Sequence, residues 1–333
     1  MIAPSILIIV LVGIALLFDF LNGFHDSSNI VATMISSRAM SPRVALLVSA
    51  VAHFSAPFLF GVAVARTIGH DVVAEEAVTI PVILAASLSA IVWNIITWWF
   101  GIPASSSHAL IGGLVGAVGI GFGLQNIQLS GLGKVIIALF TAPLLGLTGG
   151  YVIMKLVLFL VRGATPRISS LFKRLQWFTS LGLALSHGTN DAQKTMGIIT
   201  MGLVATGYLS RFEVPWWVIL LSATAIALGT ASGGWRLVRT LGGKFYKIRP
   251  IHGFTSQLSS AAVIMGAALL GGPVSTTHVV SSSILGVGSA ERLSKVRWGV
   301  VGNIAIAWVV TIPVGALMAA LLYYPMVWLT GVW

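Results

Sequence analysis

The stretch Gly23-Phe24-His25-Asp26 lies in the middle of a long apolar run, and it recurs 165 residues later as Gly188-Thr189-Asn190-Asp191. A second segment, Gly101-Ile102-Pro103-Ala104-Ser105-Ser106-Ser107-His108, recurs 170 residues later as Gly271-Gly272-Pro273-Val274-Ser275-Thr276-Thr277-His278. Matches that keep their order along a chain are the mark of an internal repeat. The sequence therefore predicts two related halves.

The chain around these motifs is too apolar for a water-soluble protein. Its 333 residues are 57% hydrophobic and 8% charged, whereas soluble proteins carry about 25% charged residues. One helical crossing of a bilayer needs about 20 apolar residues. The sequence therefore predicts an all-α polytopic membrane protein with about 10–12 transmembrane or re-entrant helices.

Ten apolar stretches are the candidates for these helices. They cover roughly 5–37, 44–65, 79–100, 102–122, 134–161, 177–208, 216–235, 250–270, 273–288 and 298–330. The first and the sixth are too long for a single crossing and carry Gly, Asn and Asp in their middle. Each of these two is therefore predicted to be a broken helix.

The basic residues indicate how the chain is oriented. Lys and Arg concentrate in the cytoplasmic loops of membrane proteins. Fourteen of the 19 Lys and Arg residues fall in four connections, which are 38–43, 162–176, 236–249 and 289–297. The net charge of +11 is therefore read as orientation and not as a nucleic-acid partner.

The topology of the two halves follows from the number of crossings. An odd number separates the motif copies, so the halves are inverted. We expect an N-terminal repeat at 1–161, a basic cytoplasmic connection at 162–176 and an inverted C-terminal repeat at 177–333. In such transporters the substrate binds near the middle of the membrane, where interrupted helices of both repeats meet.

The first motif places the carboxylates of Asp26 and Asp191 at membrane depth, where each costs at least about 2.5 kcal/mol on insertion scales. A carboxylate beside freed backbone carbonyls is a natural H⁺ or Na⁺ site. The alternative is a structural Asp that accepts hydrogen bonds from the ends of a broken helix. Asp19, on nearly the same helical face as Asp26, is expected to have an accessory or structural role. The polar groups that would complete the coupling-ion site are Asn22, Asn29, His187 and Asn190.

One asymmetry between the two Asp motifs bears on coupling. His25 stands where the other half has Asn190, and a histidine can titrate near physiological pH. Lys194 lies on the same predicted helix as Asp191 and is expected to neutralise it or to face an anion. The alternative for Lys194 is that its ammonium group reaches the membrane interface.

The second motif predicts a chain break followed by hydroxyl groups in the first turn of a helix. Free N–H groups and the positive end of the helix dipole lie at such an N-terminus, and two of them facing one another would hold a tetrahedral oxyanion. The hydroxyl groups are those of Ser105, Ser106, Ser107, Ser275, Thr276 and Thr277. The alternative is that they only cap the helices. His108 and His278 are expected to be buried with their hydrogen-bonding groups satisfied. The alternative is that they are direct ligands.

Together these motifs closely resemble the inorganic phosphate transporter (Pit) family, from about Phe18 to Thr311. The resemblance implies a phosphate symporter with two inverted repeats that forms a homodimer. Carried over residue by residue, it implies that Asp26, Asn29, Asn190 and Asp191 line the ion and substrate sites. It also implies that the hydroxyl groups of the second motif hold phosphate.

His25 indicates which branch of the family the chain resembles. Sodium-coupled members usually have Asn there, so the chain looks like the bacterial or archaeal low-affinity type. That type is taken to be proton-coupled and to carry phosphate as a neutral complex with a divalent metal such as Mg²⁺. H⁺ and Na⁺ both stay open as the coupling ion. The absence of a long central hydrophilic loop implies the plasma (inner) membrane of a prokaryote.

The same residues are also compatible with other functions. A carrier of another tetrahedral oxyanion, such as sulfate, and a passive anion channel stay open as alternatives. An intramembrane hydrolase is disfavoured, because a catalytic triad is one site with unlike roles and these motifs are duplicated. We expect no catalytic residue, no enzyme activity and no resident cofactor. The expected partners are inorganic phosphate and the lipid bilayer, and not a nucleic acid.

Overall fold

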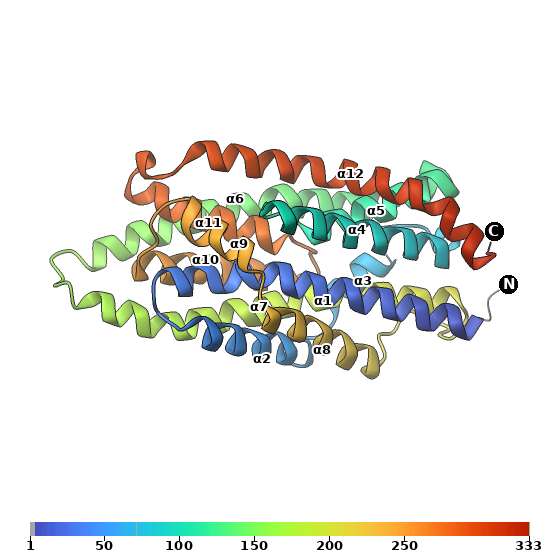
Figure 1. The fold of residues 1–333 in the computed structure, drawn as a ribbon, viewed down its shortest axis with the longest axis horizontal. Helices are drawn as coiled ribbons and strands as arrows, with labels where there is room; N and C mark the ends of the chain where they lie inside the picture. The colour runs from blue at the N-terminus through green and yellow to red at the C-terminus, as the bar shows by residue number, and fades with distance from the viewer. Residues whose placement is uncertain (1–3, 71, 333) are drawn as a thin grey trace.

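The computed structural model describes residues 4–70 and 72–332; residues 1–3, 71 and 333 of the predicted repeats lie outside this description. The described residues form twelve α-helices joined by short turns (Figure 1). The helices are α1 Pro4–Ser36, α2 Pro42–Phe60, α3 Ala63–His70, α4 Ile80–Phe100, α5 Ser106–Gly121, α6 Leu129–Leu160, α7 Ile168–Ala205, α8 Trp216–Ser232, α9 Trp235–Arg239, α10 Pro250–Leu269, α11 Thr276–Glu291 and α12 Trp298–Thr330. The shorter helical turns are η1 Glu75–Ala77, η2 Leu124–Asn126, η3 Thr240–Lys244 and η4 Leu293–Lys295.

Five of these helices are long and apolar enough to cross a membrane: α1, α2, α4, α6 and α12. A sixth candidate is the pair formed by α8 and the segment Trp235–Lys244, which is bent by 57° at the break between them. The outer faces of the bundle carry large apolar side chains such as Leu47, Phe140 and Leu321. An apolar outer face is what a helix in contact with lipid requires. The all-helical membrane fold agrees with the expectation from sequence.

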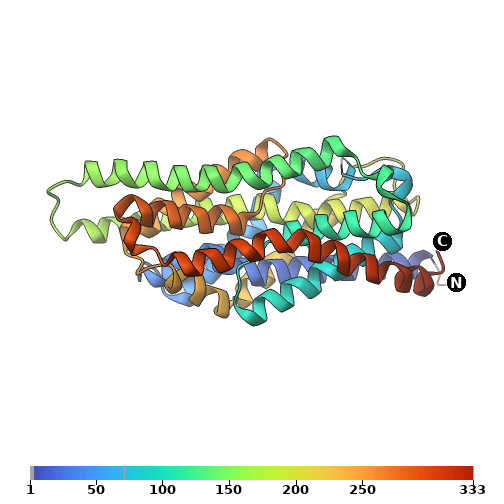
Figure 2. The same ribbon diagram turned by 90° about the horizontal axis from the view of Figure 1, so that it is seen from above.

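The two halves run in opposite directions. In Figure 1, α1 starts beside the N-terminus at the right and runs to the left, whereas its counterpart α7 starts at the left and runs to the right. Figure 2 shows the same reversal for α6 and α12. The inverted topology inferred from the odd number of crossings between the motif copies is therefore present in the fold.

The halves interlock and do not form two separate bodies. Helix α5 packs along α12, and α11 packs along α6. In the same way α1 packs on α8, and α7 packs on α2. The repeat boundaries 1–161, 162–176 and 177–333 stay a prediction. Helix α7 already begins at Ile168, so only 161–167 joins α6 to α7 without helical structure.

The prediction that the first and sixth apolar stretches are broken helices is wrong. Both α1 and α7 are continuous through their Asp motifs. The glycines of the motifs serve close packing instead. A Cβ on Gly23 would overlap the carbonyl group of Ile226 in α8, and a Cβ on Gly188 would lie 2.9 Å from the Cα of His53 in α2. An unbroken helix also satisfies its own backbone groups, which the membrane interior demands.

The apolar core is divided by the polar motifs. One cluster contains the first part of α1, including Phe18, and the last part of α7, including Met196. A second cluster contains the last part of α1, including Ile30, and Leu183 of α7. The polar motifs of α1 and α7 lie between these clusters along both helices. The fold therefore places them in the middle of the bundle.

Candidate functional site

The second motif breaks the chain twice, at equivalent places in the two halves. After α4, Gly101 adopts a φ of 65°, and after α10, Gly271 adopts a φ of 72°; such left-handed values favour glycine. Ser105 and Ser275 then cap the next helices, since each Oγ accepts a hydrogen bond at 3.2 Å from the backbone N–H of the histidine three residues later. Helices α5 and α11 therefore begin inside the bundle, as the sequence predicted.

The first turn of α11 meets both motif carboxylates. Thr276 Oγ1 lies 3.2 Å from Asp26 Oδ2 and 3.3 Å from Asp191 Oδ2. Thr277 Oγ1 donates to Asp26 Oδ1 at 3.1 Å and accepts from Asn29 Nδ2 at 3.0 Å. All five side chains are at most 2% exposed. Residues about 250 positions apart in the chain thus share one polar network.

The first turn of α5 makes different contacts. Ser106 Oγ donates to Asn22 Oδ1 at 2.5 Å. Ser107 Oγ donates to the carbonyl oxygen of Val274 at 3.4 Å, which joins the two chain breaks directly. Asn190 of α7 donates through Nδ2 to the carbonyl oxygen of Gly272 at 3.3 Å. The two breaks and the two Asp motifs therefore form one site.

Basic groups flank the two carboxylates unequally. Asp191 accepts a hydrogen bond from Lys194 Nζ, and its other oxygen lies 3.1 Å from His187 Nδ1. Asp26 lies 3.1 Å from His25 Nδ1. Lys194 is fully buried, so it does not reach the membrane interface. The prediction that Lys194 neutralises Asp191 agrees with this contact.

Three of these side chains are arranged so that they could hold a cation. One ligand atom each from Asp26, His187 and Asp191 lie within 4.8 Å of one another, and all three residues are buried. The amide oxygens of Asn29 and Asn190 and the Nε2 atom of His187 have no hydrogen-bond partner among the described residues. Carboxylate and amide oxygens are the ligands that hard cations prefer. The site combines these oxygens with hydroxyl donors and two helix N-termini, which suit an anion.

The histidines of the second motif face each other away from these contacts. The rings of His108 and His278 are 4.6 Å apart, and His278 stacks on Trp308 at 4.0 Å. Neither ring nitrogen of His108 has a hydrogen-bond partner within 4–70 and 72–332. Nε2 of His278 lacks a partner there as well, so the expectation of two satisfied histidines is not met for either ring. No hydrogen bond joins either ring to the motif carboxylates among the described residues.

Sequence reasoning missed several side chains that support the site. Gln193 of α7 accepts from the backbone N–H of Val64 at 2.6 Å and thereby holds the start of α3. Ser27 of α1 does the same for α9 by accepting from the N–H of Gly234 at 2.8 Å. His53 of α2 bonds Thr230 of α8 at 2.7 Å. Ser27 directly follows Asp26 and Gln193 lies two residues after Asp191. Their place beside the Asp motifs was therefore a signal, whereas His53 and Thr230 carried none.

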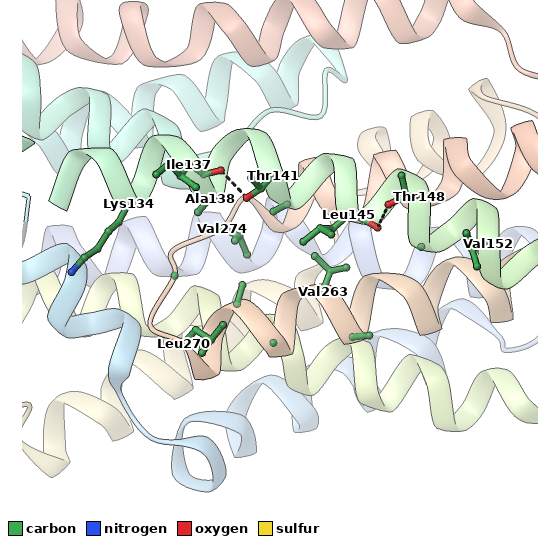
Figure 3. Close-up of a pocket in the computed structure, with 16 residues that line it drawn as sticks. Lys134, Ile137, Ala138, Thr141, Leu145, Thr148, Val152, Val263, Leu270 and Val274 are labelled. Atoms are coloured by element: carbon green, nitrogen blue, oxygen red, sulfur yellow. Dashed lines mark hydrogen bonds between the residues drawn. The ribbon is translucent and has the colours of Figure 1, made fainter. Parts of the chain in front are cut away.

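A small hollow borders the site at His25. The hollow beside His25 has a volume of about 20 Å³ and is too small for an oxyanion. A larger groove, of about 850 Å³, lies between α6 and α10. Figure 3 shows that apolar side chains such as Leu145, Val263 and Leu270 line it, with Lys134 at one end. Its lining also includes Gly272 and Val274 of the second chain break, so the groove borders the polar site without containing the motif carboxylates.

Comparison with known proteins gives the family. A sequence model of the phosphate transporter family matches residues 22–319, which include both Asp motifs and both breaks. The chain belongs to the phosphate transporter family. It is therefore a transporter and not an enzyme, and the resemblance stated from the motifs is confirmed.

Two bacterial relatives are similar over nearly their whole length. A "Probable low-affinity inorganic phosphate transporter" of Rhizobium meliloti (strain 1021) is 47% identical over 320 residues, covering 96% of each chain. Its namesake in Bacillus subtilis (strain 168) is 43% identical over 325 residues, covering 96% of this chain and 97% of the relative. These bacterial relatives and the membrane-length helices agree with a multi-pass membrane protein of the phosphate transporter family.

A solved structure confirms the fold. The protein described as "The sodium-dependent phosphate transporter" matches with a TM-score of 0.86 at 24% identity, covering 96% of this chain and 98% of the other. At this identity the likeness speaks for the architecture alone. The phosphate transporter fold of interlocked, inverted halves is thus shared with a protein of known structure.

Proposed function

We propose that this phosphate transporter is a secondary active symporter, which takes up inorganic phosphate together with H⁺ or Na⁺ by alternating access. One observation carries the proposal. The first-turn hydroxyl groups of α11, which suit an oxyanion, are hydrogen-bonded to Asp26 and Asp191, which suit a cation. Anion and cation sites that share the same hydrogen-bond donors cannot be occupied independently.

Phosphate would be held at the two helix N-termini. Its oxygens would accept from hydroxyl groups and free N–H groups there, with the amides of Asn29 and Asn190 and the ammonium of Lys194 beside them. The hydroxyl groups of this cradle are Ser105, Ser106, Ser107, Ser275, Thr276 and Thr277. Ser105 and Ser275 already accept from their own helices, but each keeps an O–H that can donate.

Coupling follows from the donors that phosphate would take. A hydroxyl group has a single O–H, so Thr276 and Thr277 cannot donate to phosphate and to the carboxylates at once. Asp26 and Asp191 would then be buried without these donors, and an uncompensated buried charge is costly. A cation at Asp26, His187 and Asp191, with Asn22 and His25 beside them, removes that cost. Phosphate therefore binds best together with the cation.

The cation is either transported alone or as part of the substrate. A proton needs one acceptor, which Asp26, Asp191 or His25 supplies. Na⁺, or a divalent ion such as Mg²⁺ travelling as a neutral metal-phosphate complex, needs several oxygen ligands. The carboxylates and the unpartnered amide oxygens of Asn29 and Asn190 would supply these. Either ion would be cargo and not a resident cofactor.

Radiolabelled phosphate uptake into proteoliposomes tests this function. An inward Na⁺ gradient is compared with an inward proton gradient, each with and without Mg²⁺, and sulfate replaces phosphate in a parallel series. Concentrative phosphate uptake under one of the gradients supports the symporter. Downhill flux alone, with no accumulation under any gradient, indicates a passive channel, and accumulation of sulfate in place of phosphate overturns the substrate.

The proposal includes the setting that the family resemblance implies. The protein would act as a homodimer in the plasma membrane of a prokaryote, with the basic connections of the chain on the cytoplasmic side. Cross-linking of the reconstituted protein and protease accessibility of 161–167 from each side of the membrane test these two statements.

A further inference from the structure

Asp19 is a buried carboxylate that the site described above does not use. It lies on α1, seven residues before Asp26, and its side chain is fully buried. Neither of its oxygens has a hydrogen-bond partner among the described residues. The polar group that faces it is the hydroxyl of Thr195 on α7, which is also buried and also lacks a partner there.

Among the described residues, the charges near Asp19 leave it without a counter-ion of its own. Asp191 and Lys194 of α7 act on it electrostatically with opposite signs. The ammonium group of Lys194 is already hydrogen-bonded to Asp191. Helices α4 and α8 also pack on α1 and carry no titratable side chain. An ionised Asp19 would therefore be an isolated buried charge, which proteins avoid by neutralising the group.

The other titratable groups on helices packed along α1 are hydrogen-bonded to other side chains or stand at other positions along the helices. His53 bonds Thr230, and His187 bonds Asp191. The remaining titratable groups on these helices are Arg43 on α2, Lys173 and Arg174 on α7, Arg236, Arg239 and Lys244 on α9 and η3, His252 on α10, and His278 and Glu291 on α11. Asp191 and Lys194 are the ones that act on Asp19 most directly.

We propose that Asp19 binds the coupling proton, at a place separate from the carboxylates that face the phosphate cradle. This inference rests on the symport function proposed above, names its ion as the proton, and assigns that proton to Asp19 in place of the acceptors considered there, Asp26, Asp191 and His25. A protonated Asp19 is neutral, and its O–H can donate to Thr195. A metal ion is a poorer occupant, because hard cations take about six or more oxygen ligands and Asp19 belongs to no group of three metal-ligating side chains among the described residues.

The position of Lys194 links this proton to phosphate. Phosphate that binds beside Lys194 adds negative charge close to Asp19. It also attracts the ammonium group of Lys194, whose positive charge partly offsets the charge of Asp19. Both changes favour the protonated form of Asp19. By thermodynamic reciprocity, a protonated Asp19 favours phosphate binding by the same factor. Proton and anion are therefore bound and released together, which is the requirement for symport.

The experiment uses the full chain in proteoliposomes that enclose a pH-sensitive dye. Wild type is expected to accumulate radiolabelled phosphate under an inward proton gradient and to acidify the lumen. In Asp19→Asn we expect proton-driven accumulation to fall by at least about tenfold, within the range typical of coupled sites, with no acidification. Exchange of external for internal phosphate, which needs no net proton movement, should persist. Ser87→Ala, which removes a buried hydroxyl of α4 without a partner, is the matched control and should behave like wild type.

The outcomes separate this inference from the proposed function. Proton-driven accumulation and acidification that persist in Asp19→Asn overturn the role of Asp19. If Asp19→Asn loses exchange as well, Asp19→Glu decides: restored accumulation with an altered pH profile supports the proton site, and no restoration overturns it. A wild type that accumulates phosphate with Na⁺ and moves no proton also overturns it while leaving the symporter in place. A wild type that takes up no phosphate defeats the proposed function itself.

Discussion

The hairpins α4–α5 and α10–α11 have the same backbone and different partners. Each turns at a glycine with positive φ, passes a proline and restarts at a capping serine. In α11 the next two side chains, Thr276 and Thr277, bond the motif carboxylates. In α5 the equivalent Ser106 and Ser107 bond a neutral amide and a backbone carbonyl. The two hairpins therefore share a scaffold, and the second one makes the contacts with the carboxylates.

The same asymmetry extends to the groups around the hairpins. By the offset of 165, Lys194 corresponds to Asn29 and Asp19 to Ala184; by the offset of 170, Glu291 corresponds to Gly121. A symmetric scaffold with an asymmetric set of charges is suited to a carrier. The scaffold can adopt two related conformations, and the charges bind one substrate and one ion. The following predictions test how far the two halves differ.

The largest effect is expected from the motif carboxylates. Asp26→Asn and Asp191→Asn should each abolish coupled phosphate uptake. Asp191→Asn should also lower thermal stability more, because it leaves the buried Lys194 without its partner, a loss that typically costs about 3–5 kcal/mol. Uptake and the melting temperature of both variants are measured in parallel. Full coupled uptake in both variants would remove the carboxylates from the site.

A smaller effect is expected from the hydroxyl groups, and it should be unequal. Thr276→Val removes a hydrogen bond to charged groups, worth about 1.5–3 kcal/mol, and should weaken apparent phosphate affinity about ten- to a hundredfold. Ser106→Ala removes a bond to a neutral amide, worth about 1 kcal/mol, and should weaken it about fivefold. The KM for phosphate uptake measures both. Equal losses would show that the two hairpins bind phosphate symmetrically.

The motif glycines should behave alike in the two halves. Gly23→Ala and Gly188→Ala each force a Cβ against the neighbouring helix, and overpacking of this kind costs about 1–3 kcal/mol. Gly13 on α1 and Gly182 on α7 have nothing within 4 Å of an added Cβ and provide the matched controls. Thermal melting of the four alanine variants compares them. Unperturbed melting of Gly23→Ala or Gly188→Ala would contradict the close packing.

The smallest effect is expected at the end of α11. Glu291 accepts from Lys295 at 2.8 Å and from His252 at 2.9 Å, and it also pairs with Arg249. Burial by itself would raise the pKa of Glu291, but the hydrogen bond from Lys295 and the charges of His252 and Arg249 outweigh it and lower the pKa to about 2. A carboxylate with a lowered pKa stabilises the fold above its ordinary pKa and loses that contribution as the pH falls toward the lowered value.

Glu291→Gln should therefore lower the melting temperature at pH 7, and the difference from wild type should shrink as the pH is lowered from 5 toward 3. Melting curves over this pH range measure it. Glu213→Gln is the control, because its pair with Arg211 is exposed and surface pairs contribute little. A pH-independent difference for Glu291→Gln would mean that the ionic cluster does not hold α11 to α10.

Much of the site could be predicted because its residues were duplicated. The glycine-proline breaks before Ser105 and Ser275 were correct, since local backbone chemistry decides them. The prediction of breaks at Gly23 and Gly188 was wrong. These glycines allow close packing against helices α8 and α2, and no local sequence pattern reveals that packing. The contact of Thr276 with Asp26 joins positions 250 residues apart and depends on the way that the halves interlock.

The sequence by itself determined the all-helical membrane fold, the two inverted halves, the family and the set of polar residues in play, because apolar run length, loop charge and repeated motifs are written along the chain. The tertiary structure decided which of these polar groups touch. Only the packing of α1, α7, α5 and α11 shows that the second hairpin contacts both carboxylates and that Lys194 pairs with Asp191. It also shows that Asp19 has no counter-ion of its own within 4–70 and 72–332. The physical reason is that the cost of a buried charge depends on its neighbours in space, and not on its neighbours in the sequence.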